Sequence, residues 1–198
     1  METLLFILRN AFFSKNYWLL IFVFGLILAT VNPVYTQTIK EKKTGIEFSQ
    51  KLELAGKKYD YVTSGSIQAS FVFTFDVCAF AFYVEEGKLD KNKNPIDQLF
   101  EDGPSKYLVI NFVRGVKAKD IRDAYEEGFK KIVTNYNTPK AKQVIEPFLN
   151  ALIDVNKNEK MEYTWSAGGN IELTIKGQKK HSFQNVGFAK ALWAIYLQ

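Results

Sequence analysis

The sequence predicts an α+β fold, in which a curved antiparallel sheet carries helices on one of its faces. Two observations lead to this prediction. The first is a central strand, Phe71–Val84, whose second half is apolar on both sides and therefore needs cover on both faces. The second is the order of the expected elements: three strands, a short helix, a strand, two helices, three strands and a final helix.

Two shorter strands are expected before the central one. Alternating apolar residues predict a strand over Ile46–Leu54. A turn at residues 55–58 leads into a second strand, Tyr59–Thr63, and Ser64-Gly65 is expected to turn the chain again. Connections this short favour an antiparallel meander.

The middle of the chain is predicted to be mainly helical. A short helical turn over Ile96–Phe100 and a buried strand over Tyr107–Val113 come first. A longer helix follows, capped by Asp120, because its apolar residues recur every three or four positions and form one stripe. Thr138-Pro139 begins the next helix, in which Pro147 is expected to cause a kink or a break.

The last forty or so residues return to strands and end in a helix. A hairpin is expected from Met161–Ser166 and Ile171–Lys176, joined by the Gly-rich residues 167–170. A further strand follows over Lys179–Phe183. The closing helix begins near Val186 and is apolar around most of its circumference, which indicates a buried helix.

The first 36 residues are expected to be separate from this domain. Arg9 and Lys15 precede Tyr17–Val31, fifteen residues without a charge. This length fits the core of an export signal better than a membrane span of about 20 residues. A cleaved signal and a retained N-terminal anchor both stay open, and both place the domain outside the cytoplasm, in the periplasm or secreted. The expected division is a signal or anchor over 1–36, a polar linker over 37–45 and one domain over 46–198.

Composition argues against several classes of protein. The net charge of +5 comes from dispersed Lys with only three Arg, so the concentrated basic stripe typical of nucleic-acid binding is absent from the sequence. One Cys excludes an internal disulfide, and one His with one Cys argues against a zinc site. No cofactor or metal is expected, and the oligomeric state stays open.

Three blocks of sequence carry a family resemblance. They are FDVCAFAFYVEEG at Phe75–Gly87, LVINFVRGVKAKDIRDAYEEGF at Leu108–Phe129, and the hairpin, Lys-Gly turn and helix from Tyr163 onwards. In this order they resemble the bacterial chalcone isomerase-like family. That family has a central strand F-x-V-Y-x-x-A-L-Y-L, a strand with a following Arg and a helix that ends in Glu-Gly, and a final helix F-x-x-A-L-W-x-I-W-L. The resemblance covers residues 46–198.

The resemblance implies an open-faced β-sandwich with a cleft between the sheet and its helices. Plant chalcone isomerases close a flavanone ring in such a cleft. A guanidinium stabilises the anion of the substrate there, and a Tyr and a Thr hold a water at its ketone. Relatives that lack these catalytic residues bind fatty acids, and in them an Arg and a Tyr hold the carboxylate of the ligand.

The sequence departs from the catalytic pattern of the family. Ser64–Ser70 contains no Arg where the enzymes carry one, and Cys78 stands near the place of the catalytic Thr. Ile121 and Gly128 stand near the places of the Tyr and Asn, and neither side chain can donate a hydrogen bond. No catalytic residue is therefore predicted, and the resemblance favours binding over catalysis.

Four residues are predicted to bind the ligand: Arg114, Tyr83, Tyr125 and Cys78. Arg114 ends a buried strand and suits bidentate recognition of a carboxylate. The two Tyr hydroxyls are candidates to face the cleft, and Cys78 belongs to its floor. Structural roles stay open for each of them: a solvated ion pair for Arg114, and core packing for the other three.

The predicted function is that of an exported, non-catalytic protein that binds a fatty acid or a similar amphipathic carboxylate. Its partner would be that small ligand, and membrane contact would come only through the N-terminal segment. One alternative is an isomerase or intramolecular lyase that acts on a chalcone-like substrate. Another is a structural subunit of an envelope complex that uses its Lys-rich surface.

Overall fold

The computed structural model describes residues 37–70 and 74–197, which belong to one compact unit, Thr36–Gln198. Its strands are β1 (Thr38–Lys40), β2 (Glu47–Ser49), β3 (Lys51–Leu54), β4 (Lys57–Ser70), β5 (Thr74–Glu85), β6 (Lys106–Phe112), β7 (Lys160–Ser166), β8 (Asn170–Ile175) and β9 (Gln178–Gln184). Its helices are α3 (Pro95–Gln98), α4 (Ala118–Ile132), α5 (Pro139–Ala151) and α6 (Val186–Leu197). The expected signal or anchor and the first three residues of the expected central strand lie outside this description. None of the described helices is long and apolar enough to cross a membrane.

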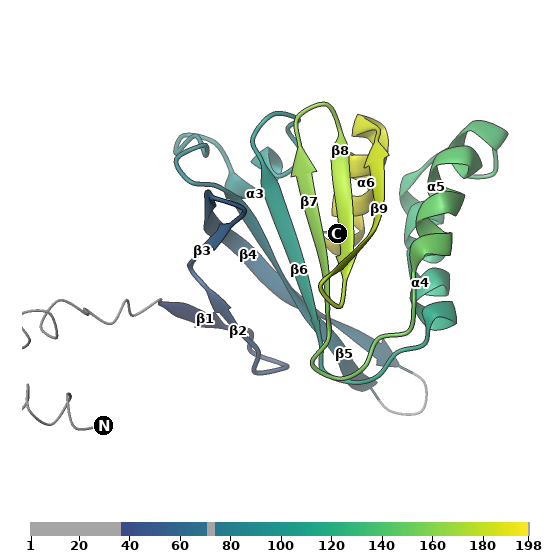
Figure 1. Cartoon of the computed structure of the whole chain (residues 1–198), viewed down its shortest axis with the longest axis horizontal. Helices are drawn as coiled ribbons and strands as arrows, with labels where there is room; N and C mark the ends of the chain where they lie inside the picture. The colour runs from purple at the N-terminus through teal and green to yellow at the C-terminus, as the bar shows by residue number, and fades with distance from the viewer. Residues whose placement is uncertain (1–36, 71–73, 198) are drawn as a thin grey trace, which may run out of the picture. The chain divides into compact units, whose positions relative to one another are not determined.

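The strands β3 to β9 form one antiparallel sheet, in which each strand pairs with the next along the chain. Figure 1 shows this sheet as a curved layer, with α6 behind it, α4 and α5 beside each other, and the β1–β2 hairpin in front. The helices α4, α5 and α6 share one buried cluster with one face of the sheet. The predicted fold class, an antiparallel sheet with helices on one face, is confirmed.

The second half of β5 forms the centre of the helix-covered core. Phe80 and Phe82 point towards α6, with ring centroids 5.2 Å from Tyr196 and 6.0 Å from Trp193, respectively. Trp193 in turn meets Trp165 of β7 edge to face at 5.2 Å. Burial of each of these large rings contributes about 1.5–3 kcal/mol to folding. This strand therefore organises the core, as its sequence indicates.

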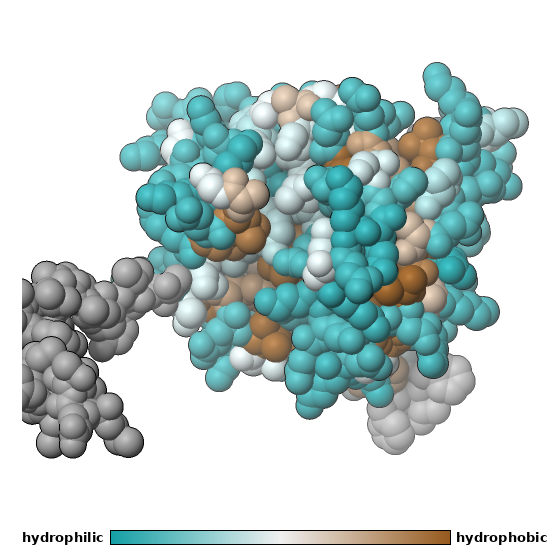
Figure 2. Space-filling view, viewed as in Figure 1, coloured by the Kyte–Doolittle hydropathy of each residue, from teal (hydrophilic) through white to brown (hydrophobic). Residues whose placement is uncertain are grey.

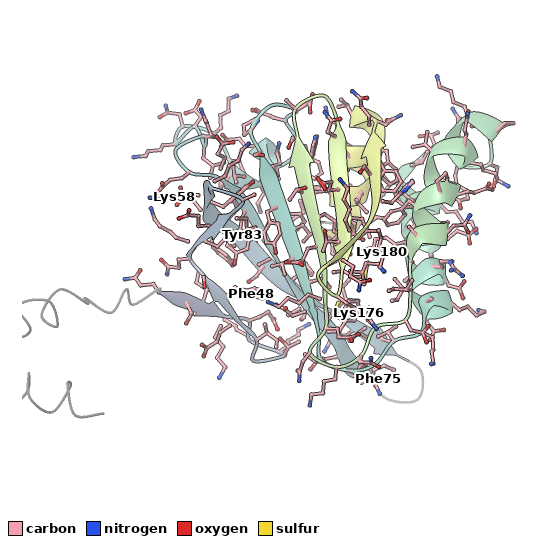
Figure 3. The ribbon with its side chains drawn as sticks, in the orientation of Figure 1. Phe48, Lys58, Phe75, Tyr83, Lys176 and Lys180 are labelled. Atoms are coloured by element: carbon pink, nitrogen blue, oxygen red, sulfur yellow. The ribbon has the colours of Figure 1, made fainter. Side chains whose placement is uncertain are left out.

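The alternate residues of β5 point to the opposite face of the sheet. Ala79 and Ala81 are fully buried there beside Tyr83 and Tyr107, under Phe48 of β2. In Figure 3, Phe48 lies between the hairpin and the sheet, near Tyr83. The hairpin thus supplies the second layer that a strand apolar on both faces requires. Outside this cover the face is mostly hydrophilic, with only small apolar areas (Figure 2).

Two parts of the N-terminal half differ from the sequence prediction. The stretch 37–45, expected as a linker, contains β1, whose Ile39 is registered with Phe48 of β2. The expected turn at Ser64-Gly65 is instead the middle of β4. Gly65 pairs with Phe80 across the strands, and a β-carbon at this position would lie 2.8 Å from the Phe80 ring. Glycine at this position leaves room for the Phe80 ring and does not mark a turn.

The helix ends also differ from the prediction in their details. Asp120 lies inside the first turn of α4, and the capping carboxylate comes from Asp154, which accepts the backbone N–H of Ala118 at 2.8 Å. Sequence periodicity cannot reveal a cap from a residue this distant. Thr138 caps α5 as predicted, accepting the N–H of Ala141 at 3.4 Å, and α5 continues as one helix through Pro147.

A fully buried lysine, Lys106, begins β6. Its ammonium lies 4.3 Å from the ring centroid of Trp165, donates to the carbonyl of Pro104 at 3.0 Å, and also donates to the carbonyl of Glu101. These bonds hold the turn before β6 against the sheet. Burial lowers the pKa of Lys106 to about 8, against the favourable charges of Asp102 and Glu101.

The free energy of unfolding is expected to rise by about 1–2 kcal/mol between about pH 7.5 and 9.5 because of Lys106. The pKa is about 8 in the folded chain and near its usual 10.5 when unfolded, so in this range the unfolded chain binds the extra proton. Raising the pH therefore favours the folded state. Urea denaturation at several pH values measures the effect. Lys106→Met should remove the rise, the exposed control Lys88→Met should keep it, and equal slopes in all three proteins would contradict the assignment.

Candidate ligand-binding site

Three phenol groups meet between the sheet and the helices, and we call them the tyrosine cluster: Tyr125 of α4, Tyr163 of β7 and Tyr196 of α6. The hydroxyl of Tyr125 is 2.7 Å from that of Tyr163 and forms a second hydrogen bond with that of Tyr196. Tyr125 and Tyr163 are buried, with 5% and 0% of their surface exposed. The cluster thus places polar atoms inside an otherwise apolar core.

The tyrosine cluster has one more donor than it can use internally. Three hydroxyls carry three protons, and each of the two hydrogen bonds consumes one. The third O–H has no acceptor among the residues that the structure describes. Tyr196 is only partly buried, so a spare O–H at its end of the cluster can donate to an acceptor oxygen from outside the chain, such as that of a water or a ligand.

Burial keeps the tyrosine cluster in its neutral form. It raises the pKa of Tyr125, and it raises those of Tyr163 and Tyr196 well above the usual value of 10.0. The hydroxyls therefore remain donors at physiological pH. A neutral donor suits the oxygen of a carboxylate or a ketone.

Cys78 lies on the same face of the sheet, in the same buried cluster as Tyr125. Its side chain is 3% exposed, and burial raises the pKa of its thiol to about 12. A protonated, buried thiol is neither a nucleophile nor a strong hydrogen-bond donor. In this position Cys78 provides a small apolar surface beside the hydroxyls.

The helices do not cover their whole face of the sheet. At the end nearest Cys78, apolar residues on this face remain exposed. The pairing of β4 with β5 puts Ile67 and Phe75 on the same face as Cys78, and these two are 38% and 40% exposed. We call this region, with Arg114, the sheet end. The guanidinium of Arg114 lies 4.0 Å from the centroid of the Phe75 ring.

Arg114 is available for a ligand. It follows the end of β6, is exposed, and forms no salt bridge with any residue of 37–70 or 74–197. The guanidinium lies over the Phe75 ring, and its N–H groups donate to no residue of 37–70 or 74–197, so they are available for a carboxylate. A cation beside exposed apolar side chains is the arrangement that an amphipathic anion requires.

Tyr83 lies apart from the other three predicted residues. It faces the opposite side of the sheet, 1% exposed, with its ring 5.9 Å from that of Tyr107. Figure 3 shows Tyr83 and Phe75 towards opposite ends of β5. The structure therefore brings Cys78 and Tyr125 together, places Arg114 at the neighbouring sheet end, and separates Tyr83 from all of them.

The sequence prediction missed four residues of this region: Ile67, Phe75, Tyr163 and Tyr196. The two tyrosines occupy inward positions of a strand and a helix that were predicted, and a hydroxyl at an inward position is the signal that could have singled them out. Their meeting with Tyr125 depends on three elements far apart in the sequence. By its sequence pattern Phe75 resembles a core residue, because a sequence does not show where along β5 the covering helices end.

Comparison with known proteins identifies the family and the fold of this chain. Residues 40–198 match the family model described as "Chalcone isomerase-like". No protein with a curated function matches the sequence. Among solved structures, a fatty-acid binding protein of Arabidopsis thaliana is similar in fold, with a TM-score of 0.66 at 17% sequence identity, over 81% of this chain and 88% of that one. The observed layers are those of the open-faced sandwich predicted from the sequence, and the chain belongs to the chalcone isomerase-like family.

Proposed function

We propose that this protein binds a fatty acid or a similar amphipathic carboxylate, without catalysis, at the sheet end. The observation that carries the proposal is the free guanidinium of Arg114 over the exposed ring of Phe75, with Ile67 exposed on the same face of the sheet. The carboxylate would accept from Arg114, and the chain would lie along the apolar residues towards Cys78. The fold of a plant fatty-acid binding protein supports a ligand of this class.

The tyrosine cluster supports the same kind of ligand. Its spare O–H would donate to a ligand oxygen that reaches inward past Cys78, while Arg114 would hold another oxygen at the surface. The non-catalytic part of the proposal rests on Cys78. Its buried, protonated thiol replaces the hydroxyl that the resemblance places near this position in the enzymes.

The location of the domain outside the cytoplasm is part of the same proposal. It rests on the uncharged run Tyr17–Val31 behind Arg9 and Lys15, in a segment that the structure does not describe. The intact mass of the protein recovered from cells would distinguish a cleaved signal from a retained anchor.

The purified full-length protein is expected to carry a co-purified lipid acid, which solvent extraction and mass spectrometry would identify. After delipidation it should bind a fluorescent fatty acid. Protein that is consistently empty and also binds no fluorescent fatty acid would refute the proposed function. Turnover of a chalcone by the wild-type protein would instead favour an isomerase.

Arg114→Gln is expected to weaken binding of the fluorescent fatty acid about tenfold, the value of one charge-assisted hydrogen-bonded contact. The affinity of Arg114→Lys should lie between those of the wild type and Arg114→Gln, because lysine keeps the charge and loses the planar fork of the guanidinium. Lys157→Gln, a change of an exposed cation elsewhere, serves as the control and should bind like the wild type. Unchanged affinity in Arg114→Gln would show that the carboxylate lies elsewhere.

A further inference from the structure

A pocket of about 510 Å³ lies where the end of α4 meets the beginnings of α5 and α6; we call it the helix pocket. Its walls are mainly apolar, and the other lining residues are three neutral polar residues, one lysine and one glycine. They are Phe129, Val133, Ala141, Val144, Ile145, Phe188 and Ala191, with Asn135, Thr138, Lys140, Asn185 and Gly187. A volume of this size accommodates a small organic molecule.

The helix pocket is separate from the sheet end and the tyrosine cluster. The rings of Phe129, Phe148 and Phe188 contact one another, with centroid distances of 5.8, 5.5 and 5.5 Å. Phe129 and Phe188 line the pocket, while Phe148 on the inner side meets Tyr125 at 5.0 Å. The three rings form a partition, so a molecule in the helix pocket would not touch the hydroxyls.

The charge around the helix pocket is one-sided. Lys140 is its only charged lining residue, and no salt bridge of Lys140 occurs within residues 37–70 and 74–197. Two helices begin at the rim, α5 after Thr138 and α6 after Asn185, and neither has an acidic residue in its first turn. The positive ends of both helix dipoles therefore add to the charge of Lys140.

Neutral donors complete this rim. The side-chain oxygen of Asn185 accepts a hydrogen bond from the backbone N–H of Phe188 at 2.9 Å. The amide NH₂ of Asn185 takes no part in this bond. That NH₂ and the side chain of Asn135 have no hydrogen-bond partner in the described part of the chain. An ammonium and two side-chain amides on the rim of one apolar pocket are suited to an anionic group.

We propose that the helix pocket is a second ligand site, which takes an anion with an apolar body. The carboxylate or phosphate group lies at Lys140, Asn135 and Asn185, and the apolar body lies against Val144 and the partition rings. This site does not depend on the ligand proposed for the sheet end. It assigns a role to the first turn of α5, which the other site does not use.

Photo-crosslinking of the full-length protein tests this site directly. The probe is a decanoate with a diazirine near its tail, and mass spectrometry of the peptides locates the labels. We expect labels on peptides that contain residues 129–145 and 185–191, whether or not residues 67–78 are labelled as well. Labels only on residues 67–78 would overturn the second site and leave the sheet-end proposal standing.

Competition distinguishes the anionic group from the apolar body. Decanoate and decyl phosphate are expected to suppress labelling of the helix pocket, and whichever does so at lower concentration identifies the preferred group. Decanol and inorganic phosphate, which each lack one half of the ligand, should suppress it far less. Suppression by decanol equal to that by decanoate, or by inorganic phosphate equal to that by decyl phosphate, would overturn the proposal.

Matched variants on α5 test the named residues. Lys140→Gln should weaken decanoate competition about two- to fivefold, the range for an exposed ion pair, while Lys142→Gln should not change it. Val144→Trp fills the pocket and should abolish its labelling, whereas Gln143→Trp, on the exposed side of α5, should retain it. Equal behaviour within either pair would contradict the site, and circular dichroism confirms that each variant is folded.

Discussion

Gly169→Ala is expected to lower the free energy of unfolding by about 2–5 kcal/mol, from backbone strain and overpacking together. Gly169 has a φ of 68°, which is unfavourable for a residue with a β-carbon. The added carbon would also lie 2.2 Å from the backbone nitrogen of Val186, at the start of α6. Backbone cannot move aside as a flexible side chain can, so the β7–β8 turn or the start of α6 must shift.

Gly177→Ala is the matched control for this prediction. Gly177 has a φ of 72°, and a β-carbon there would meet no atom within 4 Å. It should therefore show only the cost of the backbone conformation, about 1–2 kcal/mol. Urea denaturation followed by Trp fluorescence measures both variants. If the two lose equal stability, the contact between Gly169 and Val186 has no energetic importance.

Phe82→Ala is expected to cost about 3–5 kcal/mol, the usual range for a fully buried ring. Phe82 has no exposed surface, and its ring contacts those of Phe80, Trp193 and Tyr196. Its loss leaves a cavity at the centre of the helix-covered core. Thermal unfolding should show a clear decrease in Tm.

Phe75→Ala tests the other end of the same strand face and separates stability from binding. Because Phe75 is 40% exposed, its removal should cost only about 1 kcal/mol of stability. It should nevertheless weaken binding of the fluorescent fatty acid, because the proposed ligand lies along this ring and Arg114 stacks on it. A large loss of stability with unchanged affinity would mean that Phe75 is a core residue and not part of a ligand surface.

Periodicity predicted the elements well where each forms its own pattern. The central strand, the stripe of α4 and the β7–β8 hairpin all appear close to their predicted bounds. Errors arose where a residue serves a contact from another element. The sequence predicts a turn at Gly65 because glycine commonly marks one, whereas in the structure Gly65 lies under the ring of Phe80. Asp154 caps α4 from 36 residues away, a relation without a local signal.

The site was only partly predictable for the same reason. Cys78 and Tyr125 lie on the inward faces that alternation and helical spacing predict, so their nearness follows from the fold. Tyr83 obeys the same alternation: it lies five residues after Cys78 in the regular part of β5, so it is on the face opposite Cys78. The helix pocket depends on how three helix ends meet, and its rim residues, Asn135, Lys140 and Asn185, have the composition of ordinary connections.

The strand order of the seven-stranded sheet also bears on how the chain can assemble. Each strand from β3 to β9 joins the sheet beside the strand made just before it. The sheet can therefore grow at a single edge in the order of synthesis, with mostly local contacts, which favours rapid folding. The longest interval is from β6 to β7, which spans α4 and α5. No strand has to insert between two others already paired, so a chain that emerges from its N-terminus can fold progressively.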